Sequence, residues 1–459
     1  MSRVGNGRVA ASGARADTMH AVERLAGFAQ SFRARRPAPQ LLHHAKRAVI
    51  DWHAALFPGA VVAPATALER ALAEELDRGE ARLALGRRAT VRAAALVNGS
   101  AAHSVEVDDI FRDGIYHPGA PTIAAALALS QSQGGNGENL LRAVVVGYEI
   151  STRIGAAMGR AHYRFWHNTG TIGCFGACAA AAELLALDGR RFANALATVT
   201  TFCAGLQQAF RMDSMSKPLH AGRAAEAGVT AALAAREGVT GSLDVIEGEA
   251  GFGRAMADGP DWQEALATLG RDFHVTRMTF KNHACCGHAF AAIDGALALQ
   301  AKMGLRPAEI ERVRVGTYRA GLEVAHYEAP RTPAEARFSM KYVVATALTH
   351  GSVRLAAFES PRLENEETRS LMKRISVAID PELDAGFPRQ RAARIAIEAR
   401  GGRREELLQP TRVGDPDAPL SDRALEDKYM ELAGPVLGEA PARKLLERLW
   451  RLEAAPALA

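Results

Sequence analysis

The chain has 459 residues, of which 48 % are hydrophobic and 23 % are charged. This composition is typical of a globular protein, and the length exceeds one ordinary core, which predicts two domains. The net charge of +5 is small, and basic residues are interleaved with acidic ones, so we expect no nucleic-acid partner. Ala-rich runs are broken by charge or glycine before they reach spanning length, so we also expect no membrane span.

The cysteines are few and unevenly placed. They are Cys174, Cys178, Cys203, Cys285 and Cys286. This odd number forms no disulfide framework, which favours a reducing compartment and predicts a cytoplasmic protein. Residues 1–16 are Arg-rich and lack acids, which is also typical of a transit peptide. Their composition cannot bury a core, so we interpret residues 1–16 as a disordered tail.

Apolar residues recur at helical spacing from residue 17 to about residue 271, in segments bounded by Gly, Asn or Pro. Short alternating runs then predict strands at 312–318, 374–380 and 394–400, with helices between them. After Gly401-Gly402 the pattern becomes helical again. The fold class is therefore mainly α with an inserted α+β domain. Residues 17–271 and 406–459 are expected to form one all-helical domain from both chain ends, and residues 272–405 a smaller α+β lid domain.

The stretch HSVEVDDIFRDGIYHPGAP (103–121) carries several groups suited to acid–base chemistry. They are His103, Glu106, Asp108, Asp109 and His117. A carboxylate beside an imidazole raises its pKa or fixes its tautomer, as general acid–base catalysis requires. A polar loop between two helices would have the same composition.

Two further stretches offer a histidine or a lysine at the start of a helix. His167 in RFWHNTGTIGCFGA precedes a Gly-rich helix whose free N–H groups suit an anion, although a buried capping segment would look alike. Lys217 in SMSKPLHAGRAAEAG precedes a proline, which restricts its backbone, and His220 follows three residues later. A solvated lysine at a helix start is the alternative.

The stretch FKNHACCGHAF (280–290) contains ligand types for a metal ion. Two His and two Cys within six residues are too close together for one tetrahedral zinc site, and no second pair stands elsewhere at the usual spacing. Adjacent cysteines also form a strained disulfide. This leaves Lys281 and His288 as the useful groups, with Cys285 and Cys286 packed beside them.

Taken together, these stretches resemble the MmgE/PrpD family, which includes 2-methylcitrate dehydratase, cis-aconitate decarboxylase and iminodisuccinate epimerase. The motifs that carry the resemblance are HSVEVDD…HPGAP, GYE (147–149), SKPLHAGRAAEAG, EAGFG (249–253), K…CCGHAFAAID and FSMKYVVATAL (338–348). They occur in the family's order and cover nearly the whole chain.

The resemblance implies a homodimer with its active site between a helical and an α+β domain. It implies small di- or tricarboxylate substrates and no metal or other cofactor. Family positions carried over residue by residue are His117, His167, Lys217, Lys281 and Tyr342. The chain also differs from the family, because decarboxylase and dehydratase members have an Asp and a Thr where this chain has Glu106 and Ile110. Cys286 stands where some members carry a His, and HPGAP replaces the dehydratase-like HPSDN.

The expected chemistry is proton removal next to a carboxylate. We expect His167 to act as the base and His117 or Tyr342 as the acid, with Asp109 orienting His117 and Lys217 stabilising the developing negative charge. The expected substrate-binding residues are Lys281, His288, His103, Glu106 and Cys286. The sequence thus predicts a metal-independent lyase of the hydratase/dehydratase type. An epimerase or racemase, a decarboxylase, and a non-catalytic dimer that only binds carboxylates remain as alternatives.

Overall fold

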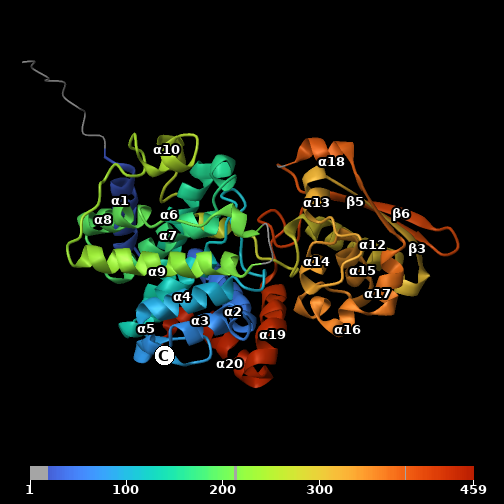
Figure 1. Cartoon of the computed structure of the whole chain (residues 1–459), viewed down its shortest axis with the longest axis horizontal. Helices are drawn as coiled ribbons and strands as arrows, with labels where there is room; N and C mark the ends of the chain where they lie inside the picture. Colours follow the sequence, from blue (N-terminus) through green and yellow to red (C-terminus); the bar gives the residue numbers. More distant parts are fainter. Residues whose placement is uncertain (1–18, 211–213, 388, 459) are drawn as a thin grey trace, which may run out of the picture.

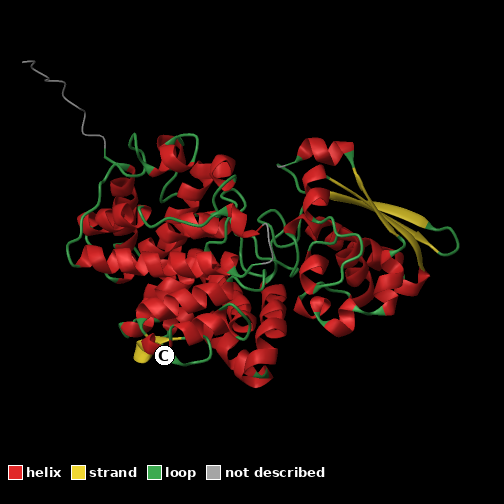
Figure 2. Ribbon diagram, in the orientation of Figure 1, coloured by secondary structure: helices red, strands yellow, loops and turns green. Residues whose placement is uncertain are grey.

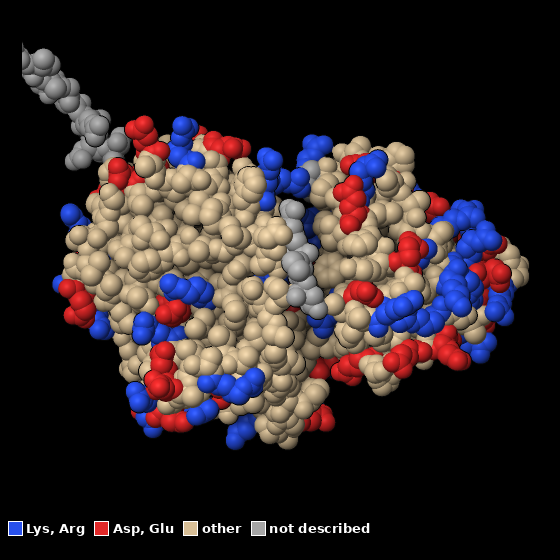
Figure 3. All heavy atoms as spheres, viewed as in Figure 1, with Lys and Arg blue, Asp and Glu red and all other residues tan. Residues whose placement is uncertain are grey.

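The computed structural model describes residues 19–210, 214–387 and 389–458 (Figure 1). The tail predicted over residues 1–16 lies outside the described residues. The chain forms a large helical body and a smaller body that holds a sheet (Figures 1 and 2). On the face seen in Figure 3, charged side chains of both signs are scattered over the helical body, whereas Lys and Arg gather more densely around the sheet.

The helical body is built around one buried helix. Its helices are α1 (Ala21–Arg33), α2 (Pro39–Ala60), α3 (Ala65–Ala71), α4 (Val91–Ala102), α5 (Gly119–Ser132), α6 (Gly137–Tyr163), α7 (Asn168–Leu184), α8 (Gly189–Thr200), α9 (Ser216–Arg236), α10 (Phe252–Met256), α11 (Trp262–Ala265), α19 (Asp422–Leu437) and α20 (Glu439–Trp450). Small residues let α7 pack closely against its neighbours α5, α6, α8 and α9. A methyl group at Gly228 of α9 would collide with the main chain at Cys178. This close approach brings the first turns of α7 and α9 together.

Both ends of the chain contribute to the helical body. Helix α19 packs on α2, where the buried Lys428 ammonium donates to the Asp51 carboxylate at 2.6 Å. Lys428 also donates to the main-chain oxygen of Val107 at 2.7 Å, so the C-terminal helices help to hold the loop after α4.

Among the described residues, no single helix is both long and apolar enough to cross a bilayer. Helices α2 and α3 reach that length and apolar content only when taken together, and they are bent by 70° relative to each other.

The smaller body combines a four-stranded sheet with short helices. Its elements are α12 (Phe290–Met303), β3 (Ile310–Thr317), α13 (Arg319–Val324), α14 (Pro333–Arg337), α15 (Met340–His350), α16 (Ser360–Leu363), α17 (Glu366–Met372), β4 (Ile375–Ile379), α18 (Pro381–Gly386), β5 (Ala393–Ala399) and β6 (Arg404–Gln409). The strand order is β4-β3-β5-β6, with β3 and β4 parallel and the other pairs antiparallel. Helices α12 and α15 pack against the sheet. The mainly α fold with an α+β domain agrees with the prediction.

Some local predictions differ from the structure. The return to helix expected at residue 406 is wrong, because β6 runs to Gln409 after a hairpin turn in which Gly401 and Gly402 have positive φ angles of 98° and 87°. A second hairpin of β1 (Leu76–Arg82) and β2 (Arg88–Ala89) lies within the helical body. The domain boundaries at 272 and 405 stay a proposal, since Ile110 pairs with Thr279 and Phe280 donates to the Gly414 carbonyl across this junction.

Candidate active site

Five of the candidate residues lie on one loop that joins α4 to α5. Asp109 anchors this loop, because its carboxyl accepts hydrogen bonds from the Gly119 N–H at 3.0 Å and from the Tyr148 hydroxyl at 2.7 Å. Burial, together with the nearby Asp51 carboxyl, raises the pKa of Asp109 to about 8. The Asp109 carboxyl is therefore mainly protonated at neutral pH, and it ties the loop to the first turn of α5 and to α6.

Asp108, not Asp109, contacts the histidines. Its Oδ2 atom lies 2.7 Å from Nδ1 of His103 and 3.1 Å from Nδ1 of His117. The prediction that Asp109 orients His117 is wrong, because Asp109 is bonded to Gly119 and Tyr148 whereas Asp108 contacts His117. Asp108 is 1 % exposed, so its charge acts on both imidazoles with little screening by water.

Four imidazoles from separate elements form a cluster. His103 ends α4, His117 precedes α5, His167 is the N-cap residue of α7 and His220 lies in the first turns of α9. The His103 ring lies 4.7 Å from the His117 ring and 5.5 Å from the His167 ring, centroid to centroid. The Nδ1 atoms of His167 and His220 are 3.0 Å apart. The structure thus joins the sequence stretches that carry His117, His167 and Lys217.

The protonation states in this cluster follow from burial. Burial lowers the pKa of His117 to about 4, and contact with Asp108 offsets only part of that effect. Burial and the neighbouring His103 also lower the pKa of His167 well below its ordinary value. For Asp108, burial acts to raise the pKa, but the contacts with His117 and His103 outweigh it and lower the pKa. His117 and His167 are therefore neutral beside an ionised Asp108 carboxylate at neutral pH.

Glu106 connects the two candidate lysines. Its Oε1 atom forms an ion pair with Lys217 of α9, and its Oε2 atom lies 3.4 Å from the Lys281 ammonium. Lys281 also donates to the main-chain oxygen of Glu106 at 2.9 Å. Burial acts to raise the pKa of Glu106, but Lys217 and Lys281 outweigh it and lower the pKa far below its usual range. Burial likewise opposes the charge of Lys217, yet Glu106 raises its pKa. Both groups are ionised, and two cations flank one carboxylate.

The stretch around the paired cysteines is buried and contains no bridge. Cys285 and Cys286 are free, and burial raises the pKa of Cys286 to about 11, so its thiol is protonated. His283 is held by Asp294 at 2.9 Å, and the second oxygen of Asp294 accepts from the Val413 N–H at 2.8 Å. His283 and Asp294 therefore fix the path of this stretch.

His288 lies in the α+β body, in an aromatic setting. Its Nδ1 atom is 2.9 Å from the Tyr318 hydroxyl, and the Phe387 ring stacks on Tyr318 with centroids 4.5 Å apart. Burial, with Arg391 and Arg412 nearby, lowers the pKa of His288 to about 3. Its imidazole is neutral, so His288 is suited to hydrogen bonding with a substrate and not to an ion pair.

Tyr342 is the predicted residue that the structure does not bring to the cluster. Its ring is fully buried in α15, and its hydroxyl donates to the main-chain oxygen of Ala357. Arg369 lies over the ring at 5.5 Å from the centroid. Among the described contacts, none joins Tyr342 to a histidine of the cluster, so the structure gives no support for its expected role as the acid.

One group of possible metal ligands occurs among the described residues. It consists of His103, Asp108 and His117, whose ligand atoms all lie within 4.8 Å of one another. Asp108 forms a hydrogen bond with His103 at 2.7 Å and lies 3.1 Å from Nδ1 of His117, a close contact without hydrogen-bond geometry. Donors around one tetrahedral zinc ion lie about 3.4 Å apart. The geometry therefore fits a hydrogen-bonded set better than a metal centre.

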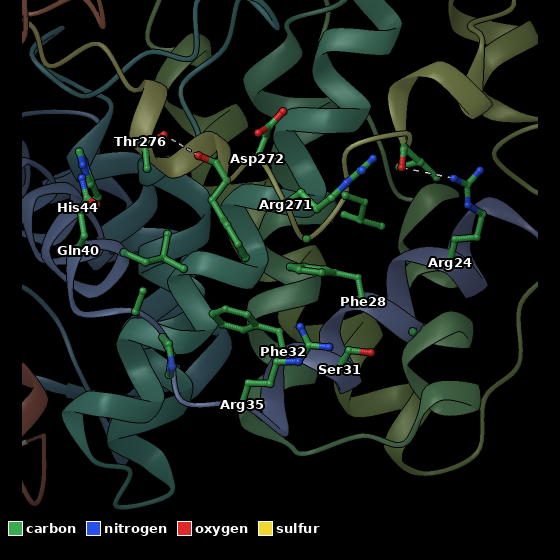
Figure 4. A pocket seen from close by; sticks show the side chains of 18 of the residues that line it. Arg24, Phe28, Ser31, Phe32, Arg35, Gln40, His44, Arg271, Asp272 and Thr276 are labelled. Carbon is green, nitrogen blue, oxygen red and sulfur yellow. Dashed lines mark hydrogen bonds between the residues drawn. The ribbon is translucent and has the colours of Figure 1, made fainter.

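A pocket with a volume of about 1010 Å³ lies elsewhere, between α1 and residues 266–277 (Figure 4). Phe28 and Phe32 line it, with Arg35 and Arg271 nearby. No candidate site residue is among the described residues that line this pocket. Despite its volume, this pocket is therefore not the candidate active site.

Two residues that the structure places at the site, His220 and Arg337, had no role predicted from the sequence. His220 stands three residues after Lys217 in one helix, so the helical period could have placed both on one face. Arg337 ends α14, and its main-chain oxygen accepts a hydrogen bond from the Cys286 N–H at 2.9 Å. No sequence pattern marks Arg337, because it depends on a contact between distant segments.

Two family models together match most of the chain. The MmgE/PrpD N-terminal domain matches residues 23–265, and the MmgE/PrpD C-terminal domain matches residues 283–453. The chain is 28 % identical over 397 residues to the "cis-aconitate decarboxylase-like protein oryM" of Aspergillus oryzae, covering 80 % of this chain and 79 % of that protein. It is 27 % identical over 370 residues to the cis-aconitate decarboxylase of Homo sapiens, covering 78 % and 76 %. It is 24 % identical over 440 residues to that of Aspergillus terreus, covering 90 % and 89 %. The chain therefore belongs to the MmgE/PrpD family and is an enzyme of this type.

Proposed function

We propose that the chain is a lyase that decarboxylates a small unsaturated tricarboxylate of the cis-aconitate class. The observation that carries this proposal is the juxtaposition of a buried imidazole cluster, held by Asp108, with two lysines bridged by Glu106. The names of the similar proteins support the substrate class and favour decarboxylation over the dehydration expected from the sequence.

The two lysines, Lys217 and Lys281, explain why the proposed substrate carries several carboxylates. Lys217 comes from α9 of the helical body, whereas Lys281 lies on the segment that leads into the α+β body. The Lys281 side chain is only 4 % exposed, so water screens its charge weakly. Such lysines hold carboxylates as point charges and stabilise negative charge that develops between them.

The reaction needs one proton. The bond between a carboxylate and its CH₂ carbon breaks, and the electron pair moves through the adjacent double bond to the carbon that bears a second carboxylate. The lysines stabilise this carbanion. His117 then gives one proton to that carbon, which leaves carbon dioxide and an unsaturated dicarboxylate.

His117 takes up its proton when the substrate binds. The pKa of about 4 leaves this imidazole neutral in the free enzyme. Three substrate carboxylates nearby would raise that pKa, because an opposite charge within a few Å favours the protonated form. Asp108 also stabilises the imidazolium through its contact with Nδ1 at 3.1 Å. His117 is therefore the proposed acid, and Asp108 takes the orienting role first expected of Asp109.

A hydratase/dehydratase reaction is the second candidate. The observation that favours it is the pairing of His167 with His220, whose Nδ1 atoms are 3.0 Å apart. This pair provides a second imidazole, and elimination of water requires a base in addition to an acid. His167 is the proposed base for that reaction.

Incubation with a panel of polycarboxylates in deuterated water, followed by proton and carbon NMR, tests the proposal. We expect an unsaturated tricarboxylate to lose one carboxyl group and the product to carry one deuterium. His117→Gln should abolish turnover, and His326→Gln, a change of an exposed histidine outside the cluster, should not. Loss of water from a hydroxy-tricarboxylate would favour the second candidate. Exchange with inversion would indicate an epimerase, and binding without any reaction would contradict the proposal.

We further propose that the enzyme works without a metal or other cofactor as a cytoplasmic homodimer. The support is the hydrogen-bonded geometry around Asp108, the five free cysteines and the family resemblance. Light scattering during size-exclusion chromatography should give about 98 kDa, twice the chain mass of 48.9 kDa. A mass of one chain would contradict the dimer.

A further inference from the structure

Arg337 is a half-buried arginine beside the candidate site. It ends α14, a helix that starts at a capping box in which Thr332 and Glu335 bond each other's main-chain N–H groups. Its guanidinium lies over the Phe358 ring, 5.2 Å from the centroid. The hydrogen bond from the Cys286 N–H fixes its main chain to the stretch that follows Lys281. The arginine is therefore positioned before any ligand binds.

The charge of Arg337 is not neutralised among the described residues. Its Nε atom is buried without a hydrogen-bond partner, and no described acid forms an ion pair with it. Burial lowers its pKa, and the nearby Glu106 and Cys285 offset part of this effect. Glu106 itself already contacts two lysines. A half-buried cation whose buried Nε has no hydrogen-bond partner is costly to the fold, which favours a ligand anion at that place.

Some other arginines of the same body have partners for their guanidinium groups, although the Nε atom of Arg391 is also buried without one. Arg412 forms two hydrogen bonds with the Asp415 carboxylate, at 2.7 Å and 2.8 Å. Arg369 also lies over an aromatic ring, but it donates to the main-chain oxygens of Leu363 at 2.8 Å and Pro330 at 2.7 Å. Among the described residues, a buried Nε without a hydrogen-bond partner is thus shared by Arg337 and Arg391 and is not found at Arg412 or Arg369.

We propose that Arg337 binds one carboxylate of the substrate and makes the site selective for three carboxylates over two. This inference rests on the proposed function for the class of substrate, and it does not depend on which bond is broken. A guanidinium presents two parallel N–H donors to a carboxylate, which an ammonium cannot do. Arg337 lies in the α+β body and Lys217 in the helical body, so a tricarboxylate held by both spans the two bodies.

The test compares two ligands that the enzyme cannot convert. Propane-1,2,3-tricarboxylate and glutarate have the same carbon backbone and differ by one carboxylate. Isothermal titration calorimetry should show tighter binding of the tricarboxylate to the wild type. Arg337→Met should weaken tricarboxylate binding by about 30-fold or more, as for loss of one partner of a buried charge pair, and leave glutarate binding within about threefold. Arg337→Lys keeps the charge without the paired donors, and it should recover only part of the preference.

Controls separate binding from folding and from the proposed reaction. Arg374→Met changes a half-buried arginine of the same body whose guanidinium donates to the main-chain oxygen of Ile310, and it should leave the preference intact. Circular dichroism checks that each variant is folded. If the wild type shows no preference, or if Arg337→Met weakens both ligands equally, the inference is wrong. If the preference depends on Arg337 but no tricarboxylate is decarboxylated, the inference holds and the proposed reaction fails.

Discussion

Lys281 holds Glu106 at two points. Its ammonium donates to the main-chain oxygen of Glu106 at 2.9 Å and lies 3.4 Å from the carboxylate. Glu106 has a positive φ angle of 61°, which costs a residue with a side chain about 1–2 kcal/mol. The contacts with Lys281 stabilise this backbone, and the carboxylate is thereby directed to Lys217 as well. Glu106, in its strained backbone conformation, thus sets the positions of the Lys217 and Lys281 ammonium groups.

Glu106→Gln should lower the free energy of unfolding by about 1–3 kcal/mol at pH 7, because it leaves two partly or fully buried lysines without their shared acid. The pKa of Glu106 is lowered in the folded state. Its contribution is therefore present above the unfolded pKa and is lost as the pH falls. Urea unfolding at pH 7 and pH 4 should show a smaller difference from wild type at pH 4. Glu80→Gln, which changes an exposed glutamate, is the control, and an equal loss there would contradict the assignment.

The His117 imidazole should remain neutral over the physiological pH range. Its lowered pKa of about 4 places the titration far below that of an ordinary histidine. Histidine Cε1–H NMR spectra, assigned by loss of a signal in His117→Gln, should show no shift of this resonance between pH 5.5 and 8. Addition of propane-1,2,3-tricarboxylate should raise the midpoint. A midpoint near pH 6.5 in the free protein would contradict a buried, neutral His117.

The sequence predicted those parts of the fold whose patterns are local. Strands β3, β4 and β5 alternate apolar and polar residues, and they lie within one or two residues of the predicted ranges. Strand β6 escaped prediction because REELLQ forms an edge strand with no fully buried position, so its apolar residues carry little periodic signal.

The sequence predicted which residues form the site better than it predicted which of them contact one another. The structure gathers His117, His167 and Lys217, whose stretches the sequence had singled out. Which of two adjacent acids faces an imidazole depends on the backbone path after Glu106, and no periodicity encodes that path. Arg337 depends likewise on packing between α14 and the Cys286 stretch.

Asp109 should make stability decrease as the pH rises. Its folded-state pKa of about 8 lies above the unfolded value near 4, so its contribution is complete below pH 4 and is lost as the pH rises through 8. Between pH 6 and 8, the free energy of unfolding of the wild type should therefore fall by about 1.4 kcal/mol per pH unit relative to Asp109→Asn, which cannot ionise. Asp113→Asn, at a side chain that is 57 % exposed, should keep the wild-type slope. Parallel slopes for wild type and Asp109→Asn would show that Asp109 is ionised in the fold.

The enzyme should contain no stoichiometric metal. Asp108 forms a hydrogen bond with His103 at 2.7 Å and lies 3.1 Å from His117, and an ion would have to push these groups apart. Elemental analysis after dialysis should find far less than one zinc or iron per chain, and treatment with a chelator should leave turnover unchanged. Near-equimolar zinc that is lost in His103→Gln would identify this cluster as a metal centre instead.

Lys281 and the adjacent cysteines should respond differently to substitution. Lys281 is a buried cation that contacts Glu106, so Lys281→Ala should raise KM for a polycarboxylate by about 30-fold or more, beyond any effect on kcat. Cys285 is a free, buried thiol whose pKa is raised by burial, so it is a poor nucleophile at neutral pH. Cys285→Ser should therefore leave kcat and KM within a few-fold of wild type. Steady-state kinetics of both variants, with unfolding temperatures as a check on folding, decide the matter. A folded Cys285→Ser variant without activity, beside a Lys281→Ala variant with normal KM, would assign the chemistry to the thiol and remove the basis for a lysine-held carboxylate.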